Sequence, residues 1–228
     1  MELEELRRKI KDNRTVPNNC IDVLHYTKHL KDIVDKDRFI LSKFAQSNDK
    51  RESYDRLQRR EEIDKYRYMS TTSYKRTLEN IYSFRNPVLW MYYADKYKGV
   101  TFSIDANKII DDYKDYIVNY GYVEYIRGIH DDLTTGEYLM CKSEEWEYEQ
   151  EYRIIFGGID SIEEFSKYIN EVYFGCECSD SFKRIIKSKL NGVTFHDTYF
   201  DTHDGRINTI IPKDIENVVD QFGLHTNR

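Results

Sequence analysis

The chain has 228 residues, a net charge of −6 and many aromatic side chains, including 20 Tyr and 11 Phe. Its length fits one domain. Disordered chains of this charge are poor in large apolar groups, so the aromatic content excludes an unfolded chain. With 3 Pro and 10 Gly, the composition also excludes collagen-like and linker-rich architectures. The acidic balance does not favour a broad nucleic-acid surface, and no apolar run reaches the ~18–20 residues that cross a bilayer.

The cysteines and the N-terminus indicate an intracellular setting. Cys20, Cys141, Cys176 and Cys178 are interpreted as reduced structural thiols, because a chain of this length forms a core without disulfides. One residue separates Cys176 from Cys178, and no second Cys or His pair follows at metal spacing, so no metal site is expected. The acidic, amphipathic N-terminus is unlike a secretory signal. We therefore expect a cytoplasmic protein without a membrane segment.

Hydrophobic periodicity predicts short strands interrupted by helices of unequal length. The expected helices are 2–12, 29–35, a helix from Pro87 to Gly99, 106–113 capped by Asp105, 138–141, 161–169 and 179–190. The expected strands are 22–27, 38–42, one from Tyr66 into a polar turn at 70–73, 100–104, 116–125, 151–156, 171–174, 193–200 and 206–211.

These elements predict an α+β fold, a single domain with mixed, mainly antiparallel sheets and peripheral helices. The expected organisation is an N-terminal amphipathic helix and loop over 1–21, one α+β domain over 22–213 and a C-terminal tail over 214–228. Residues 48–65 are almost wholly charged and fit a mixed-sign helix and a mobile excursion equally well.

Three polar clusters are candidates for chemistry. His25 ends an apolar strand and is followed by Tyr26 and Thr27; it is also readable as a histidine of the core or of a sheet edge. The hydroxyl run 70–73 is also readable as a turn. The third cluster places Glu147, Glu149, Glu151 and Arg153 at alternate positions, which on a strand would put all four on one face. Like charges on one face repel, so they face either water or a site.

Further side chains near these clusters leave two readings open. Trp90, Tyr93 and Trp146 are able to stack on a base or a nicotinamide, but Trp90 equally fits a helix core. Lys142 and Arg153 would either pair with a phosphate or neutralise the acidic segment.

The order of the three clusters resembles that of ADP-ribosyltransferases: a strand-borne His, a hydroxyl-rich strand end, and a Glu-x-Glu that opens a strand. The resemblance implies a split sheet and implies that NAD is the cofactor, consumed as a substrate. It implies catalytic roles for Glu151, Glu149 and His25. It further implies a cofactor-binding set of His25, Tyr26, Thr27, Ser70, Thr72, Tyr93 and Arg153. A carboxylate there would stabilise the cationic sugar as nicotinamide leaves.

A second resemblance spans residues 22–200. The chain resembles the bacterial family named domain of unknown function 2971, and the segment from Trp146 to Arg153 is the most specific part of the match. Tyr92 stands where that family often has His. Such genes resemble those near phage-defence and abortive-infection systems, which implies a toxin or effector and a cognate antitoxin or defence partner.

Three classes of function therefore remain open. The first is an enzyme that transfers ADP-ribose from NAD to a protein or nucleic-acid acceptor. The second is a non-catalytic component of a defence cassette that binds a nucleotide or a protein. The third is a nuclease that holds a metal at its carboxylates, although no nuclease signature accompanies them.

Overall fold

The computed structural model describes residues 2–14, 22–47, 49, 61–73, 83–128, 132–203 and 205–209. Most of the charged segment 48–65, the residue Cys20 and the whole predicted tail 214–228 lie outside these described residues. Within them, no helix is both long and apolar enough to cross a membrane.

Helices and strands alternate along the described chain. The α-helices are α1 (Leu3–Asn13), α2 (Leu30–Lys36), α5 (Pro87–Tyr93), α6 (Ala106–Asp112), α7 (Thr135–Tyr138) and α8 (Asp180–Lys189). Shorter 3₁₀ turns are η1 (Phe44–Gln46), η2 (Ser83–Arg85), η3 (Glu144–Glu149) and η4 (Phe165–Tyr168). The strands are β1 (Asp22–Thr27), β2 (Arg38–Ile40), β3 (Ser42–Lys43), β4 (Tyr66–Ser73), β5 (Val100–Asp105), β6 (Ile117–Tyr122), β7 (Glu124–Ile126), β8 (Cys141–Ser143), β9 (Glu151–Gly157), β10 (Ser161–Glu163), β11 (Ile169–Phe174), β12 (Thr194–Asp201) and β13 (Arg206–Thr209).

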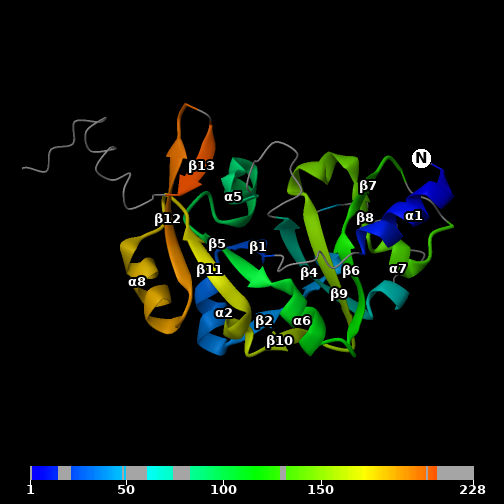
Figure 1. Cartoon of the computed structure of the whole chain (residues 1–228), viewed down its shortest axis with the longest axis horizontal. Helices are drawn as coiled ribbons and strands as arrows, with labels where there is room; N and C mark the ends of the chain where they lie inside the picture. Colours follow the sequence, from blue (N-terminus) through cyan, green and yellow to red (C-terminus); the bar gives the residue numbers. More distant parts are fainter. Residues whose placement is uncertain are drawn as a thin grey trace, which may run out of the picture.

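One large, mostly antiparallel sheet organises these elements (Figure 1). Its strands follow the order β13-β12-β11-β5-β1-β4-β9-β6, with β3 paired to β4, and only β11 and β12 among them run parallel. Two small pairs, β10 with β2 and β7 with β8, complete the described sheets. The predicted α+β, single-domain architecture with mainly antiparallel pairing is thus confirmed.

Helices cover both faces of the sheet. Below the sheet in Figure 1, α2 and α6 bury Leu30, Ile33 and Ile109 against one face, in a cluster that also holds Phe102 and Phe165. On the opposite face α5 packs the fully buried Trp90 against β1. Full burial of a large apolar side chain contributes roughly 1.5–3 kcal/mol, so both layers stabilise the central strands.

A third cluster covers the other end of the sheet, near β4 and β9. Leu6 and Ile10 of α1 pack there with Phe44, Tyr68 and Ile155. The N-terminal helix predicted over 2–12 therefore forms and contributes directly to the core.

Local signals at helix starts behave as the sequence indicates. Asn86 and Asp105 accept hydrogen bonds from the backbone N–H groups of Val88 and Lys108, which caps α5 and α6. Pro87 occupies the first turn of α5, where a missing N–H costs nothing. However, α5 ends at Tyr93 rather than at Gly99, because a run of left-handed residues begins at Asp95.

Each of the strands predicted over 38–42 and 116–125 divides in two, into β2 and β3 and into β6 and β7. Three other local predictions are wrong. The hydroxyl run 70–73 forms the end of β4 instead of a polar turn. The expected helix over 161–169 is replaced by β10 and η4, because Ile162 is buried opposite Phe39 of β2 and Glu164 adopts a left-handed φ of 49°. The helix expected over 138–141 ends at Tyr138, and Cys141 begins β8.

Candidate functional site

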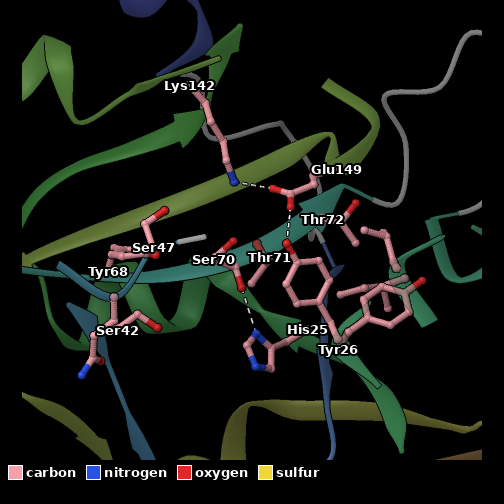
Figure 2. A pocket seen from close by; sticks show the side chains of 14 residues that line it. His25, Tyr26, Ser42, Ser47, Tyr68, Ser70, Thr71, Thr72, Lys142 and Glu149 are labelled. Atoms are coloured by element: carbon pink, nitrogen blue, oxygen red, sulfur yellow. Dashed lines mark hydrogen bonds and ion pairs between the residues drawn. The ribbon is translucent and has the colours of Figure 1, made fainter. Parts of the chain in front are cut away.

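The central sheet divides between β1 and β4. These strands pair only at Val23↔Ser73 and Leu24↔Thr72, whereas β1 pairs with β5 along its whole length. Beyond Leu24 the two strands diverge, and a pocket of about 210 Å³ lies in the gap. Figure 2 shows side chains from both strands around it. The residues that line it are Leu24, His25, Tyr26, Ser42, Gln46, Ser47, Tyr68, Ser70, Thr71, Thr72, Leu89, Tyr93, Lys142 and Glu149.

His25 bridges the gap between the diverging strands. Its Nδ1 atom lies 2.9 Å from the carbonyl oxygen of Ser70, and since a carbonyl only accepts, Nδ1 carries the proton. The ring also contacts Phe39 and Phe102 at centroid distances of 5.0 and 5.3 Å. Burial lowers the pKa of His25 to about 4, although the hydrogen bond to Ser70 opposes this shift. His25 is therefore a neutral, oriented imidazole at pH 7.

The hydroxyl run contributes three residues to the pocket wall. The Ser70 hydroxyl lies near the carboxylate of Glu151 on the neighbouring strand β9 and helps to lower its pKa. Thr71 donates its hydroxyl to the carbonyl of Tyr152 at 2.6 Å, which ties β4 to β9. Thr72 stands opposite Glu151 in the ladder and lines the pocket.

The acidic segment does not form the strand that the alternation predicts. Residues 144–149 form the 3₁₀ turn η3, Gln150 takes a left-handed φ of 47°, and β9 begins only at Glu151. As a result the four charged residues do not share one strand face. Glu147 lies exposed to solvent, whereas Glu149 is buried and reaches the pocket.

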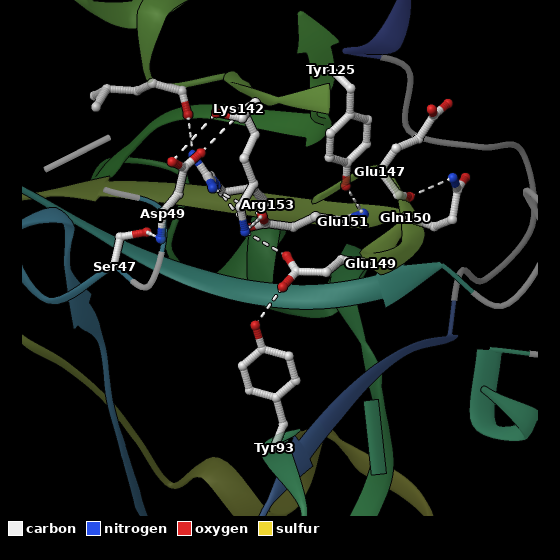
Figure 3. Close-up of polar contacts among 12 residues, drawn as sticks. Ser47, Asp49, Tyr93, Tyr125, Lys142, Glu147, Glu149, Gln150, Glu151 and Arg153 are labelled. Atoms are coloured by element: carbon white, nitrogen blue, oxygen red, sulfur yellow. Dashed lines mark hydrogen bonds and ion pairs between the residues drawn. The ribbon is translucent and has the colours of Figure 1, made fainter. Parts of the chain in front are cut away.

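Two carboxylates and two cations form a buried cluster behind and beside the pocket (Figure 3). Lys142 of β8 places its Nζ 2.5 Å from Glu149 and 3.3 Å from Glu151. Arg153 holds Glu151 with two bonds, from Nε at 2.7 Å and from Nη2 at 2.9 Å. Tyr93 of α5 donates its hydroxyl to the other oxygen of Glu149. The two opposite charge pairs leave this buried cluster close to neutral.

Glu151 and Arg153 stand one layer behind the pocket wall. Their exposed fractions are 1% and 0%, and neither lines the pocket. The Arg153 guanidinium lies over the rings of Phe44 and Tyr68 at 5.4 and 4.9 Å. Burial alone would raise the pKa of Glu151, but Arg153 and then Lys142 lower it to about 2. This pair is a fixed ionic support beneath Ser70.

Some of the remaining predicted site residues line the pocket, and the others belong to the surrounding fold. Tyr26 and Tyr93 line the pocket, and the Tyr26 ring stands edge-on to buried Trp90 at 5.3 Å. Thr27 does not reach the pocket; its hydroxyl accepts from the backbone N–H of His29 at 2.9 Å. Trp90 belongs to the core, where its indole donates to the Phe84 carbonyl, so the core reading of this residue holds.

Some pocket residues have no clear signal in the sequence. Ser42, Gln46 and Ser47 come from β3, η1 and the residue after it, and reach the pocket because β3 pairs with β4. Lys142 is readable from the sequence as a neutralising partner of the acidic segment, and the structure gives it that place. Its position between two glutamates depends on β8 and η3 folding onto β9.

The described part of the chain holds few side chains that could bind a metal or act as a reactive thiol. There, no group of three or more His, Cys, Asp or Glu side chains is arranged to hold a metal ion. The ammonium of Lys142 occupies the space between Glu149 and Glu151. Cys141, Cys176 and Cys178 form no disulfide with one another, and burial raises the pKa of Cys178 to about 11.

Comparison with protein-family models, with curated proteins and with solved structures finds no match for the chain.

Proposed function

We propose that the chain is an NAD-dependent ADP-ribosyltransferase-like enzyme. The observation that carries the proposal is the convergence of His25, Ser70, Thr72 and Glu149 on one pocket. Their three segments lie far apart in the sequence, yet β1, β4 and β9 are consecutive neighbours in the sheet, and Glu149 directly precedes the turn into β9. The order that resembles ADP-ribosyltransferases therefore corresponds to one place in the fold.

The pocket wall presents a carboxylate, Glu149, to the sugar that becomes cationic when NAD is cleaved. When the bond between the ribose C1 and the nicotinamide nitrogen breaks, its electron pair leaves with nicotinamide, and positive charge develops on the sugar. A buried carboxylate at the wall stabilises that charge strongly, because few water molecules screen it. Glu149 holds this position, and an acceptor then bonds to C1 and releases its proton.

The size of the pocket suits the reacting end of NAD. Pockets that enclose whole ligands measure about 300–1,000 Å³, whereas this one measures about 210 Å³. The nicotinamide and its ribose would enter, beside Tyr26 and Tyr93, and the adenine half would extend outside. Neutral His25, whose Nδ1 proton is donated to Ser70, would accept a hydrogen bond from a ribose hydroxyl at Nε2 rather than pair with a phosphate.

The proposal also covers the type of sheet and the role of the protein in the cell. We assign the sheet to the ADP-ribosyltransferase-like split type, since β1 and β4 diverge at the pocket. We further propose that the chain is similar to the family named domain of unknown function 2971 and acts as a toxin or effector in phage defence. Its acceptor would be a protein or a nucleic acid, with a cognate antitoxin or defence protein as partner.

The test compares two glutamates of the same turn. NAD at millimolar concentration should raise the melting temperature of the wild-type protein, and nicotinamide should be released. Glu149→Gln should keep the thermal shift and lose about 100-fold or more of nicotinamide release. Glu147→Gln, the same change at an exposed carboxylate, should match the wild type. Absence of any thermal shift with NAD would contradict the proposal.

One observation favours the second class, a non-catalytic binding component. Both oxygens of Glu149 already have partners, Lys142 and Tyr93, as in a structural carboxylate. In that case NAD or another nucleotide would raise the melting temperature without release of nicotinamide from the wild-type protein. The same two measurements therefore separate the two classes.

A further inference from the structure

Lys142 is the cation that stands between the two glutamates at the pocket. Its Nζ lies 2.5 Å from Glu149 and 3.3 Å from Glu151, and its exposed fraction is 7%. The same ammonium lies 5.0 Å above the ring of Trp146, on the turn that carries Glu149. Three separate contacts thus fix the lysine in place, on a strand that contributes no other residue to the pocket.

The two glutamates depend on this lysine to different degrees. Glu151 is bonded twice by Arg153, so it keeps a strong cationic partner without Lys142. Glu149 has Lys142 as its ion-pair partner and Tyr93 as a neutral donor. Buried carboxylates that share a site cannot both ionise readily without a nearby cation. Loss of Lys142 would therefore affect Glu149 most.

Among the residues that the structure describes, the other titratable groups around Glu149 do not replace the ammonium. The pKa of Glu149 is raised overall from its ordinary value, because burial raises it most and the charge of Glu151 raises it further, while Lys142 opposes both effects. Burial raises the pKa of the Tyr125 and Tyr148 hydroxyls, so both are uncharged at pH 7. Arg153 is engaged by Glu151. The charged and titratable groups that interact with Glu149 in the described part of the chain are Lys142, Glu151, Tyr93, Tyr125 and Tyr148.

We propose that Lys142 is a positioning residue that keeps Glu149 ionised and holds its carboxylate against the pocket wall. In the proposed reaction this charge stabilises the cationic sugar, so the inference rests on the proposed function for its catalytic meaning. Lys142 itself has no role as a phosphate ligand in this arrangement, because the two glutamates take up its charge.

The direct test measures the ionisation of Glu149 without NAD. A carbon-13 carboxyl NMR titration, with the signal assigned by its loss in Glu149→Gln, should show Glu149 ionised at pH 7 in the wild-type protein. Lys142→Met should raise its titration midpoint by about 1–3 pH units. Lys142→Arg, which restores the cation, should return the midpoint toward the wild-type value. Lys98→Met, at an exposed lysine, should not change it.

Two outcomes would overturn the inference. One is a wild-type Glu149 that titrates above pH 7, a measurement that needs no variant. The other is an unchanged midpoint after loss of the ammonium. If Lys142→Met does not fold, Lys142→Gln provides the second uncharged variant, because its amide still donates a hydrogen bond to the carboxylate.

Measuring nicotinamide release as a function of pH separates this inference from the proposed function. The acid limb of nicotinamide release should move upward in Lys142→Met, in parallel with the NMR midpoint, and Lys142→Arg should recover it. A shifted midpoint in a protein that never cleaves NAD would retain the role of Lys142 and reject the proposed function. Cleavage whose pH profile is the same in wild type and Lys142→Met would reject the role of Lys142 alone.

Discussion

The imidazole Nδ1 of His25 donates to the backbone carbonyl of Ser70 at 2.9 Å, at the point where their two strands separate. Beyond Leu24, β1 and β4 no longer pair, so the His25 side chain supplies the hydrogen bond to Ser70 that a backbone N–H of β1 would otherwise donate. This contact joins the first two clusters singled out in the sequence. It also fixes the tautomer and orientation of the histidine at the pocket.

The partly buried position of His25 and its lowered pKa predict a pH-dependent stability. The unfolded chain takes up the proton near pH 6.5, whereas folded His25 does so near pH 4. The unfolded state therefore binds more protons between these values, and stability falls as pH drops through this window. At pH 5 the loss should be about 2 kcal/mol relative to pH 7.

A non-titrating variant isolates this effect. His25→Asn can still donate to the Ser70 carbonyl but takes up no proton, so its stability should change less between pH 7 and pH 5. Urea unfolding at both values, followed by Trp fluorescence, measures the difference. An equal loss in both proteins would assign the pH dependence to other groups.

The ionic support beneath Ser70 should be essential for folding. Glu151→Gln would remove the carboxylate that accepts two hydrogen bonds from the guanidinium of Arg153, which is 0% exposed. Breaking a buried pair in this way costs about 3–5 kcal/mol. Glu147→Gln should stay within about 0.5 kcal/mol of the wild type in the same urea titration. A small loss for Glu151→Gln would mean that water or another anion reaches Arg153.

Acid should weaken the same support. The pKa of Glu151 is lowered from 4.5 to about 2, since Arg153 and Lys142 outweigh the effect of burial. A carboxyl with a lowered folded pKa contributes stability above its unfolded pKa and loses it as pH falls toward the folded value. Between pH 4.5 and pH 2 the wild-type protein should therefore lose stability faster than Glu151→Gln does.

Close backbone approach makes Gly175 a sensitive position. A Cβ atom there would lie 2.0 Å from the carbonyl oxygen of Tyr97 and 3.0 Å from the ring of Trp90. Gly175→Ala must shift this backbone and should cost about 1–3 kcal/mol or more. Gly136→Ala, in α7 with open space around the new methyl, should be neutral or slightly stabilising. Thermal unfolding of the two variants gives the comparison.

Most of the fold follows from local patterns, but the site depends on contacts distant in sequence. The alternation in 100–104, Pro87 at a helix start and the cap Asp105 predict elements that form, because strong local signals agree with the packing. The alternating glutamates resemble a strand, but the left-handed residue Gln150 interrupts it. Likewise Ser161 resembles a helix cap, but burial of Ile162 against β2 favours a strand.

The pocket shows the same division between local and tertiary information. His25, Ser70 and Glu149 are recognisable as residue types in a particular order. The sequence does not show which glutamate faces the pocket, because the direction of each side chain depends on η3 and on Lys142 from another strand. Sequence order therefore identifies the strands, and tertiary ion pairing decides which carboxylate is presented.

Tyr93 offers a milder perturbation of the pocket carboxylate than removal of Lys142. Its hydroxyl donates to Glu149, and this bond favours the ionised form. Tyr93→Phe removes the bond and keeps the ring, so the pKa of Glu149 should rise while the pocket keeps its shape. Under the proposed function, nicotinamide release should fall about 3–10-fold at pH 6 and recover most of this loss at pH 8. Tyr92→Phe, at the adjacent residue with an exposed fraction of 72%, should leave release unchanged at both values. An equal loss at pH 6 and pH 8 would instead mean that Tyr93 contacts NAD directly, since a change in the ionisation of Glu149 acts only on the acid side.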